Sequence, residues 1–290
     1  VPVENTAVAV IFYNKQMFEQ YDLEVPETWS ELLDVAQVLI DNGIAPFSLA
    51  NKTKWTSSMY YMYLVDRLGG PEVFASAANR TGGSFEDPVF VQAGEMVQEL
   101  VEMGGFNEGF NGLDYDTGQG RMLMYANQAA MELMGSWELS NFLAENEDFF
   151  NNALGVFPFP AVEGGEGSPT NVVGTVGDNY YHISTNCDYP DEAFEMITYL
   201  IDDTSVAERV EAGRIPPVVG ISEMLEDPML QEVMQIVEEA ESVQLWYDQY
   251  LPPELGEVHK DLMQALFGLE ITPEEAAAAH EEAVANYFGG

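Results

Sequence analysis

The segment Ala7–Tyr13 is apolar at every position and is rich in β-branched and aromatic residues. A strand with one face in water alternates apolar and polar residues, whereas a strand buried on both faces does not. The segment therefore predicts an interior strand of a sheet whose two faces are both covered.

Short strands and helices alternate along the rest of the chain. Apolar runs predict strands at Ala130–Met134, Leu154–Phe157, Val172–Val176, Tyr180–Ser184 and Val243–Tyr247. Capping boxes, in which a threonine and a glutamate three residues later bond each other's backbone N–H groups, predict helix starts at Thr28 and Thr272. A helix over Pro190–Asp202 is expected to bury Ala193, Phe194, Ile197 and Leu200. This alternation is typical of an α/β protein and favours parallel strands.

The charge balance of the chain is strongly acidic. Its 290 residues include fifty Asp and Glu against nine Lys and Arg, which gives a formal net charge of −41. Such a surface repels phosphate backbones and anionic lipid, so nucleic-acid binding and charge-driven membrane binding are excluded. The same charge keeps a protein soluble at high concentration or in strong salt.

Sites for metals and cofactors are not indicated. Cys187 is the only cysteine, so neither an intrachain disulfide nor a cysteine metal cage can form. His182, His259 and His280 show no metal-ligand spacing, and the last two lie on acidic helices where we expect them to be solvated. No Gly-x-Ser-x-Gly motif or phosphate loop is present, and no apolar run reaches membrane-spanning length. We expect no cofactor, no metal and no catalytic residue.

The stretch Ala129–Trp137 predicts a corner between a strand and a helix. A short buried strand ends at Gly135, and Ser136 suits the N-cap of the helix that follows. Trp137 then lies where a side chain can stand over a cleft. Its indole offers a flat apolar face and one N–H donor, which suits a ligand with C–H patches and hydroxyls. The alternative interpretation is a core tryptophan near a loop.

Two other tryptophans have similar surroundings in the sequence. Trp55 follows Asn51, Trp137 stands between Ser136 and Glu138, and Trp246 precedes Asp248 and Gln249. Sugar recognition pairs indole faces against C–H groups with carboxylates or amides against hydroxyls. We therefore expect the three corners to converge on one sugar-binding cleft. Trp29 lies inside a capping box and is expected to pack instead.

Two alternatives remain open. A glycoside hydrolase would need a pair of carboxylates, for which Glu4, Glu138 and Asp178 are the least surface-like candidates. With fifty carboxylates in the chain, a suitable pair arises by chance, so this signal is weak. The other alternative is a binding protein for a non-sugar solute, such as a polyamine or a peptide. Competition by salt would separate a polyamine from a neutral sugar.

Four motifs in order carry a family resemblance. They are Val1-Pro2-Val3 followed by Phe12-Tyr13-Asn14-Lys15, then Val25–Leu32, then Ala129–Trp137, then Asp191–Phe194 with Tyr199-Leu200. The chain resembles the extracellular solute-binding proteins of sugar ABC transporters, in the branch that binds oligosaccharides and is related to the maltose-binding protein.

The resemblance implies a two-lobed α/β fold of the type II periplasmic-binding-protein class, with sugar bound between lobes that close by hinge motion. It implies that residues 1–157 and 221–290 form the C-terminal lobe. Residues 158–220 would belong to the N-terminal lobe, most of which would lie upstream of Val1. It also implies a monomeric, extracellular or periplasmic lipoprotein, anchored through an N-terminal segment, that hands its oligosaccharide to the permease subunits of an ABC transporter.

The resemblance also assigns ligand-binding residues. Trp137 matches the family's stacking tryptophan, and Trp55 and Trp246 match aromatics of the same lobe. The further positions that it implies lie at the lobe crossings and on the returning strand, and they are Glu4, Asn5, Asp178, Asn179 and Arg214. The polar residues beside the three tryptophans, Asn51, Glu138 and Asp248, complete the predicted ligand contacts.

Overall fold

The structure is a computed structural model that describes residues 1–177 and 179–289. Its centre is a six-stranded sheet of β1 (Ala7–Asn14), β2 (Ala45–Phe47), β3 (Ala129–Gly135), β4 (Leu154–Phe157), β5 (Val172–Thr175) and β6 (Val243–Gln244). The order is β2-β3-β1-β5-β6, with β4 also paired to β1. The strand predicted from Ala7–Tyr13 is thus interior, and all but one of its residues are buried.

The sheet is mixed and not parallel throughout. The strand β1 pairs antiparallel with β3, β4 and β5, whereas β2–β3 and β5–β6 are parallel. Along one edge of β1, Ala7 faces Thr175 of β5 and Ile11 faces Phe157 of β4. The predicted parallel arrangement is therefore wrong around β1, because strand composition indicates burial but not the direction of the partner.

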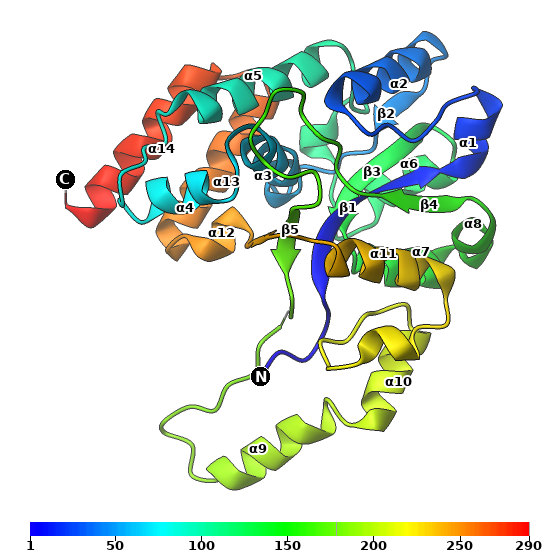
Figure 1. The fold of residues 1–290 in the computed structure, drawn as a ribbon, viewed down its shortest axis with the longest axis vertical. Coiled ribbons are helices and arrows are strands. Elements are labelled where there is room, and N and C mark those ends of the chain that lie inside the picture. Colours follow the sequence, from blue (N-terminus) through cyan, green and yellow to red (C-terminus); the bar gives the residue numbers. More distant parts are fainter. Residues whose placement is uncertain (178, 290) are drawn as a thin grey trace.

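The described chain contains fourteen α-helices, most of which lie around the sheet (Figure 1). They are α1 (Lys15–Gln20), α2 (Trp29–Asp41), α3 (Trp55–Gly69), α4 (Glu72–Ala78), α5 (Pro88–Glu102), α6 (Gln119–Tyr125), α7 (Glu138–Glu145), α8 (Glu147–Asn152), α9 (Pro190–Tyr199), α10 (Asp203–Glu211), α11 (Pro228–Glu238), α12 (Tyr247–Tyr250), α13 (Pro253–Phe267) and α14 (Pro273–Phe288), with short 3₁₀ turns at Phe110–Gly112 and Ile221–Met224. The capping boxes at Thr28 and Thr272 are confirmed at the starts of α2 and α14.

The helices α9 and α10 lie apart from the sheet, at the bottom of Figure 1. Ile197 is the only residue of α9 that is buried, and Phe194 is 54% exposed. The predicted inward face of α9 is therefore wrong for Phe194, although its helical spacing is correct. Tyr189 and Tyr199 are also exposed, so the segment carries apolar side chains that none of the described residues covers.

Two predicted strands are shorter in the structure. In the segment Tyr180–Ser184, Tyr180 forms only an isolated bridge with Pro2. The segment Val243–Tyr247 contributes two residues to β6, because Trp246 already precedes the first turn of α12. Among the helices of the described chain, none has the length and apolar character needed to cross a bilayer.

Helix α3 is buried on all sides, including its charged residues. Arg67 pairs with Asp66 at 2.7 Å and donates to the backbone carbonyls of Phe159, Pro160, Pro169 and Asn171. One guanidinium therefore ties α3 to the loop between β4 and β5. A helix that buries charges in this way relies on every one of these bonds.

The histidines His259 and His280 are buried and not solvated, which corrects the sequence expectation. They lie on the facing sides of α13 and α14, with ring centroids 5.3 Å apart, while the acidic residues point outward. The Nε2 atom of His259 lies 2.6 Å from Oγ of Ser58. Burial lowers the pKa of both imidazoles, that of His280 to about 3.

The buried pair makes stability fall in mild acid. The unfolded histidines take up protons below their ordinary pKa of about 6.5 but the folded ones do not, so this part of the stability is complete above pH 6.5 and is lost as pH falls. We expect His280→Gln to flatten the decline in unfolding free energy between pH 6.5 and 5 by up to about 1.4 kcal/mol per pH unit. Urea titrations at each pH measure this slope. The exposed His182 provides the control, because His182→Gln removes an imidazole that the fold does not bury.

Candidate ligand-binding site

Three of the four tryptophans meet at one place. The ring of Trp137 lies 6.0 Å from that of Trp55 and 5.7 Å from that of Trp246, with interplanar angles of 60° and 64°. Trp55 begins α3, Trp137 stands between β3 and α7, and Trp246 precedes α12. Ends of three distant elements thus form one aromatic wall, as the sequence predicts.

This wall encloses a pocket of about 360 Å³. Its lining is mainly aromatic and sulfur-containing, with one carboxylate and one amide: Trp55, Met59, Met62, Tyr115, Trp137, Trp246, Asp248 and Gln249. An apolar wall with a few polar groups, at this volume, is typical of a site for a small organic ligand. Asp248 is the only charged side chain among the described residues that line it. Burial raises the pKa of its carboxyl group, against the opposing effect of Lys260.

The corner that presents Trp137 depends on Gly135. A Cβ atom on Gly135 would overlap the indole, so the glycine lets the ring fold back over the end of β3. Ser136 does not cap α7, contrary to the prediction. Its hydroxyl donates to the Thr6 carbonyl at 2.7 Å and accepts from the Val8 N–H at 3.3 Å, because Ser136 still runs beside β1.

A polar layer lies behind the indole. The Nε1–H of Trp137 donates to the Tyr115 hydroxyl at 2.8 Å, and that hydroxyl donates to Oε2 of Glu138 at 2.6 Å. Glu138 also accepts from Arg121 at 2.6 Å and from Asn141 at 2.8 Å. Its side chain is 0% exposed, so Glu138 does not reach the pocket, which corrects its predicted ligand contact.

The structure places Asn51 outside the pocket as well. Its Oδ1 accepts from the Thr56 hydroxyl at 3.0 Å and the Ser57 N–H at 3.2 Å, and its Nδ2 donates to Asn111 at 2.7 Å. Asn51 is fully buried, and it holds the first turn of α3 so that Trp55 is fixed. Its role here is structural, because each of its amide atoms already has a protein partner.

The predicted residues at the lobe crossings form a separate cluster. Arg214 pairs with Glu4, and Oδ1 of Asn5 accepts from the Ile215 N–H at 2.8 Å. Asn5 is buried and bonded in this way, and it does not line the aromatic pocket. Asp178 lies outside the described residues. Asn179 is exposed and does not line the aromatic pocket.

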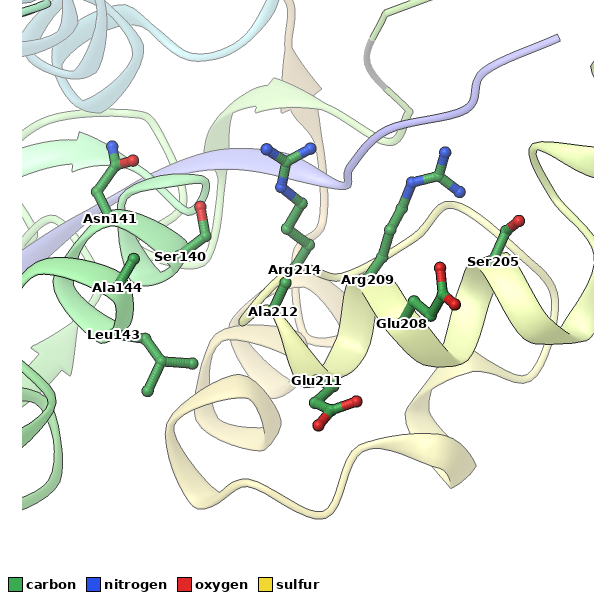
Figure 2. A pocket seen from close by; sticks show the side chains of 10 residues that line it. All are labelled: Ser140, Asn141, Leu143, Ala144, Ser205, Glu208, Arg209, Glu211, Ala212 and Arg214. Carbon is green, nitrogen blue, oxygen red and sulfur yellow. The ribbon is translucent and has the colours of Figure 1, made fainter.

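A second cleft, of about 640 Å³, lies between α7 and α10. Figure 2 shows Arg209 and Arg214 extending from α10 and its end in the same direction, with Ser140 and Asn141 of α7 opposite them. Glu208 and Glu211 also line it, so the cleft mixes both signs of charge. It contains Arg214 but none of the tryptophans.

Sequence reasoning missed Tyr115, Met59 and Met62 as pocket residues. Tyr115 lies in an irregular loop, where no periodicity indicates the direction of a side chain. The two methionines lie on α3, which is buried on all sides, so hydrophobic periodicity does not single out their side of the helix. In the described chain, no group of three or more His, Cys, Asp or Glu side chains is placed to hold a metal ion.

A second buried carboxyl group lies on β3, beneath the polar layer that Tyr115, Glu138 and Arg121 form behind Trp137. Glu132 is 1% exposed, and its Oε2 has no hydrogen-bond partner within the described residues. Burial, reinforced by the charge of Glu138, raises its pKa well above the ordinary value. At pH values above the ordinary range of a glutamate, the folded protein therefore holds a proton on Glu132 more tightly than the unfolded chain does.

We expect Glu132→Gln to stabilise the protein at pH 8. Because the folded pKa is raised, the wild-type chain loses stability as pH rises above about 4.5, the usual range of an unfolded glutamate, whereas glutamine needs no proton. The expected gain is about 1–3 kcal/mol at pH 8, and it should vanish near pH 4. Urea unfolding at both pH values measures it. The exposed Glu95→Gln removes the same charge from α5 and should give no comparable gain.

Comparisons with known proteins identify the family. The model of the bacterial extracellular solute-binding protein family matches residues 1–207. The multiple sugar-binding protein of Streptococcus mutans is 25% identical over 232 residues, and an uncharacterized ABC transporter extracellular-binding protein of Pyrococcus horikoshii is 29% identical over 167 residues. These matches cover 77% and 56% of this chain, but only 52% and 36% of the two relatives.

Solved structures agree with the fold. One from work on xylan utilization by the thermophilic bacterium Caldanaerobius polysaccharolyticus is 31% identical, with a TM-score of 0.88 over 98% of this chain and 72% of that one. A chitin oligosaccharide binding protein is 24% identical, with a TM-score of 0.85 over 98% of this chain and 70% of that one. The predicted α/β fold of the periplasmic-binding-protein type is confirmed. The chain belongs to the bacterial extracellular solute-binding protein family.

Proposed function

We propose that this chain captures an oligosaccharide, without breaking any bond, and delivers it to the permease of an ABC transporter. The observation that carries the proposal is the pocket in which Trp55, Trp137 and Trp246 converge beside Asp248 and Gln249. Indole faces contact the C–H surfaces of sugar rings, while a carboxylate and an amide bond to hydroxyls. Anionic sugars are disfavoured, because no cation among the described residues lines this pocket.

The chemistry of the pocket favours binding over hydrolysis. Glycosidases act with two carboxyl groups that flank the scissile bond. Among the described pocket residues only Asp248 is a carboxylate. The names of similar proteins point the same way, since they include a multiple sugar-binding protein and structures with stachyose or raffinose. A polyamine would be attracted by Asp248 alone, so charge gives little support for that alternative.

We further propose that the ligand lies between two lobes. Residues 1–157 and 221–290 would form one lobe, and residues 158–220 would belong to the other. The exposed apolar side chains of α9 support this division, because helices with uncovered apolar faces need a partner surface. The structural neighbours are also longer, since this chain covers 72% of the first. The proposal also includes closure of the lobes around the ligand, a lipid anchor, an extracellular or periplasmic location and a monomeric state.

Titration of intrinsic tryptophan fluorescence with xylo-, chito- and galacto-oligosaccharides tests the function. Three indoles at the pocket should report binding as a signal that saturates and then stays constant. A signal that decays as reducing ends accumulate would indicate a hydrolase instead. A response to spermidine that salt abolishes, with none to sugars, would favour a polyamine. The chain should be studied with the additional length that its relatives carry, because both proposed lobes are then present.

A further inference from the structure

We infer that Glu138 and Arg121 are positioning residues that fix the indole plane of Trp137 through the Tyr115 hydroxyl. The inference rests on the proposed function for its consequence in binding, but its structural part is independent. None of the comparisons assigns a role to these side chains. Neither Glu138 nor Arg121 lines the aromatic pocket.

The Tyr115 hydroxyl is the centre of this arrangement. It has one proton, which it donates to Oε2 of Glu138 at 2.6 Å. Because that proton is donated to a carboxylate, the oxygen can only accept a hydrogen bond from Trp137, and it accepts the indole N–H at 2.8 Å. Burial and the neighbouring Glu138 both raise the pKa of Tyr115, so the hydroxyl keeps its proton at any physiological pH.

Glu138 is itself held in place from two sides. Arg121 donates one N–H to its Oε1 at 2.6 Å, and Asn141 donates to its Oε2 at 2.8 Å. The remaining fork of Arg121 binds Glu145 through two bonds of 2.8 and 2.7 Å. Arg121 and Asn141 thus each hold a different oxygen of the Glu138 carboxylate, which fixes its orientation and, through Tyr115, that of the indole.

This arrangement decides what Trp137 offers to a ligand. Its indole N–H is already bonded within the protein, so the ring presents its face and not its donor. Trp137 would therefore contact C–H groups of a sugar, while hydroxyl recognition falls to Asp248 and Gln249. Because the ring is fixed before the ligand arrives, binding avoids the entropy of ordering it, an advantage of about three- to tenfold in affinity.

Two glutamates on α7 provide a matched pair of variants. Glu138→Gln and Glu145→Gln each remove one carboxylate that Arg121 grips, but only Glu138 bonds to Tyr115. The first measurement is hydrogen exchange of the Trp137 indole N–H, followed by NMR in the ligand-free protein and assigned with Trp137→Phe. We expect faster exchange in Glu138→Gln and an unchanged rate in Glu145→Gln.

The second measurement is oligosaccharide affinity by calorimetry. We expect Glu138→Gln to weaken binding by about three- to tenfold and Glu145→Gln to leave it unchanged. If Glu138→Gln does not fold, Tyr115→Phe removes only the hydroxyl and should also speed the exchange of the indole N–H. Exchange that is unchanged in both Glu138→Gln and Tyr115→Phe, or equally fast in Glu145→Gln, would overturn the inference. A wild-type chain that binds no sugar would overturn the proposed function, while the exchange rates would still decide the inference.

Discussion

Replacing Trp137 with alanine is expected to weaken oligosaccharide binding by about 30-fold or more, or about 2 kcal/mol. Trp137 is the middle ring of the aromatic wall and touches both Trp55 and Trp246. Its loss would remove one stacking face and also the support between the two outer rings. Isothermal titration calorimetry is the appropriate measurement, because the substitution itself changes the fluorescence.

Trp29 offers the control for this substitution. It is buried and stacks on Phe159, with ring centroids 6.0 Å apart, and it does not line the pocket. Trp29→Phe should lower the free energy of unfolding and leave the sugar affinity unchanged. If a folded Trp137→Ala protein kept the wild-type affinity, Trp137 would have no part in the site.

The largest expected loss of stability comes from Arg67→Met, at about 3–5 kcal/mol. The substitution keeps apolar volume but leaves the Asp66 carboxylate buried without its cation. It also removes the donor for the carbonyls of Phe159, Pro160, Pro169 and Asn171. Each orphaned group then carries its full cost of desolvation. Urea unfolding at constant ionic strength measures the difference.

An exposed arginine shows how much of that loss comes from burial. Arg80 pairs with Glu281 at the surface, where its side chain is 36% exposed. Arg80→Met removes the same charge but should cost only about 0–1 kcal/mol, since water replaces the ion pair. Equal losses in the two variants would mean that overall charge, and not the buried network, sets the stability.

The sequence predicts where the pocket lies better than it predicts which residues line it. Trp55, Trp137 and Trp246 all lie at ends of elements, and such ends are recognisable from capping residues and breaks in periodicity. Glu138 is only one residue beyond Trp137, yet its side chain points away from the pocket into the protein, where it bonds to Arg121 and Tyr115. Those partners come from elements that no local pattern connects to α7. Contacts of this kind appear only with the tertiary structure.

The differences between the predicted fold and the structure have a similar cause. The buried character of β1 is evident from its residues, but the antiparallel direction of its partners depends on long-range pairing. His259 and His280 lie among acidic residues in the sequence, and the helix faces that separate them become clear only when α13 meets α14. The helical spacing of Phe194 is correct, but its exposure depends on which surface covers α9.

The placement of β1 also governs when the protein can fold during its synthesis. This first strand has no neighbour close in sequence, since its partners are β3, β4 and β5. The chain must be made as far as Thr175 before the last of these can pair with β1, and contacts between such distant segments form slowly. Before β3 has been made, β1 lacks all three of these strand partners, so the centre of the sheet cannot begin to form. That delay is compatible with passage through a narrow translocation channel, which accepts extended chains.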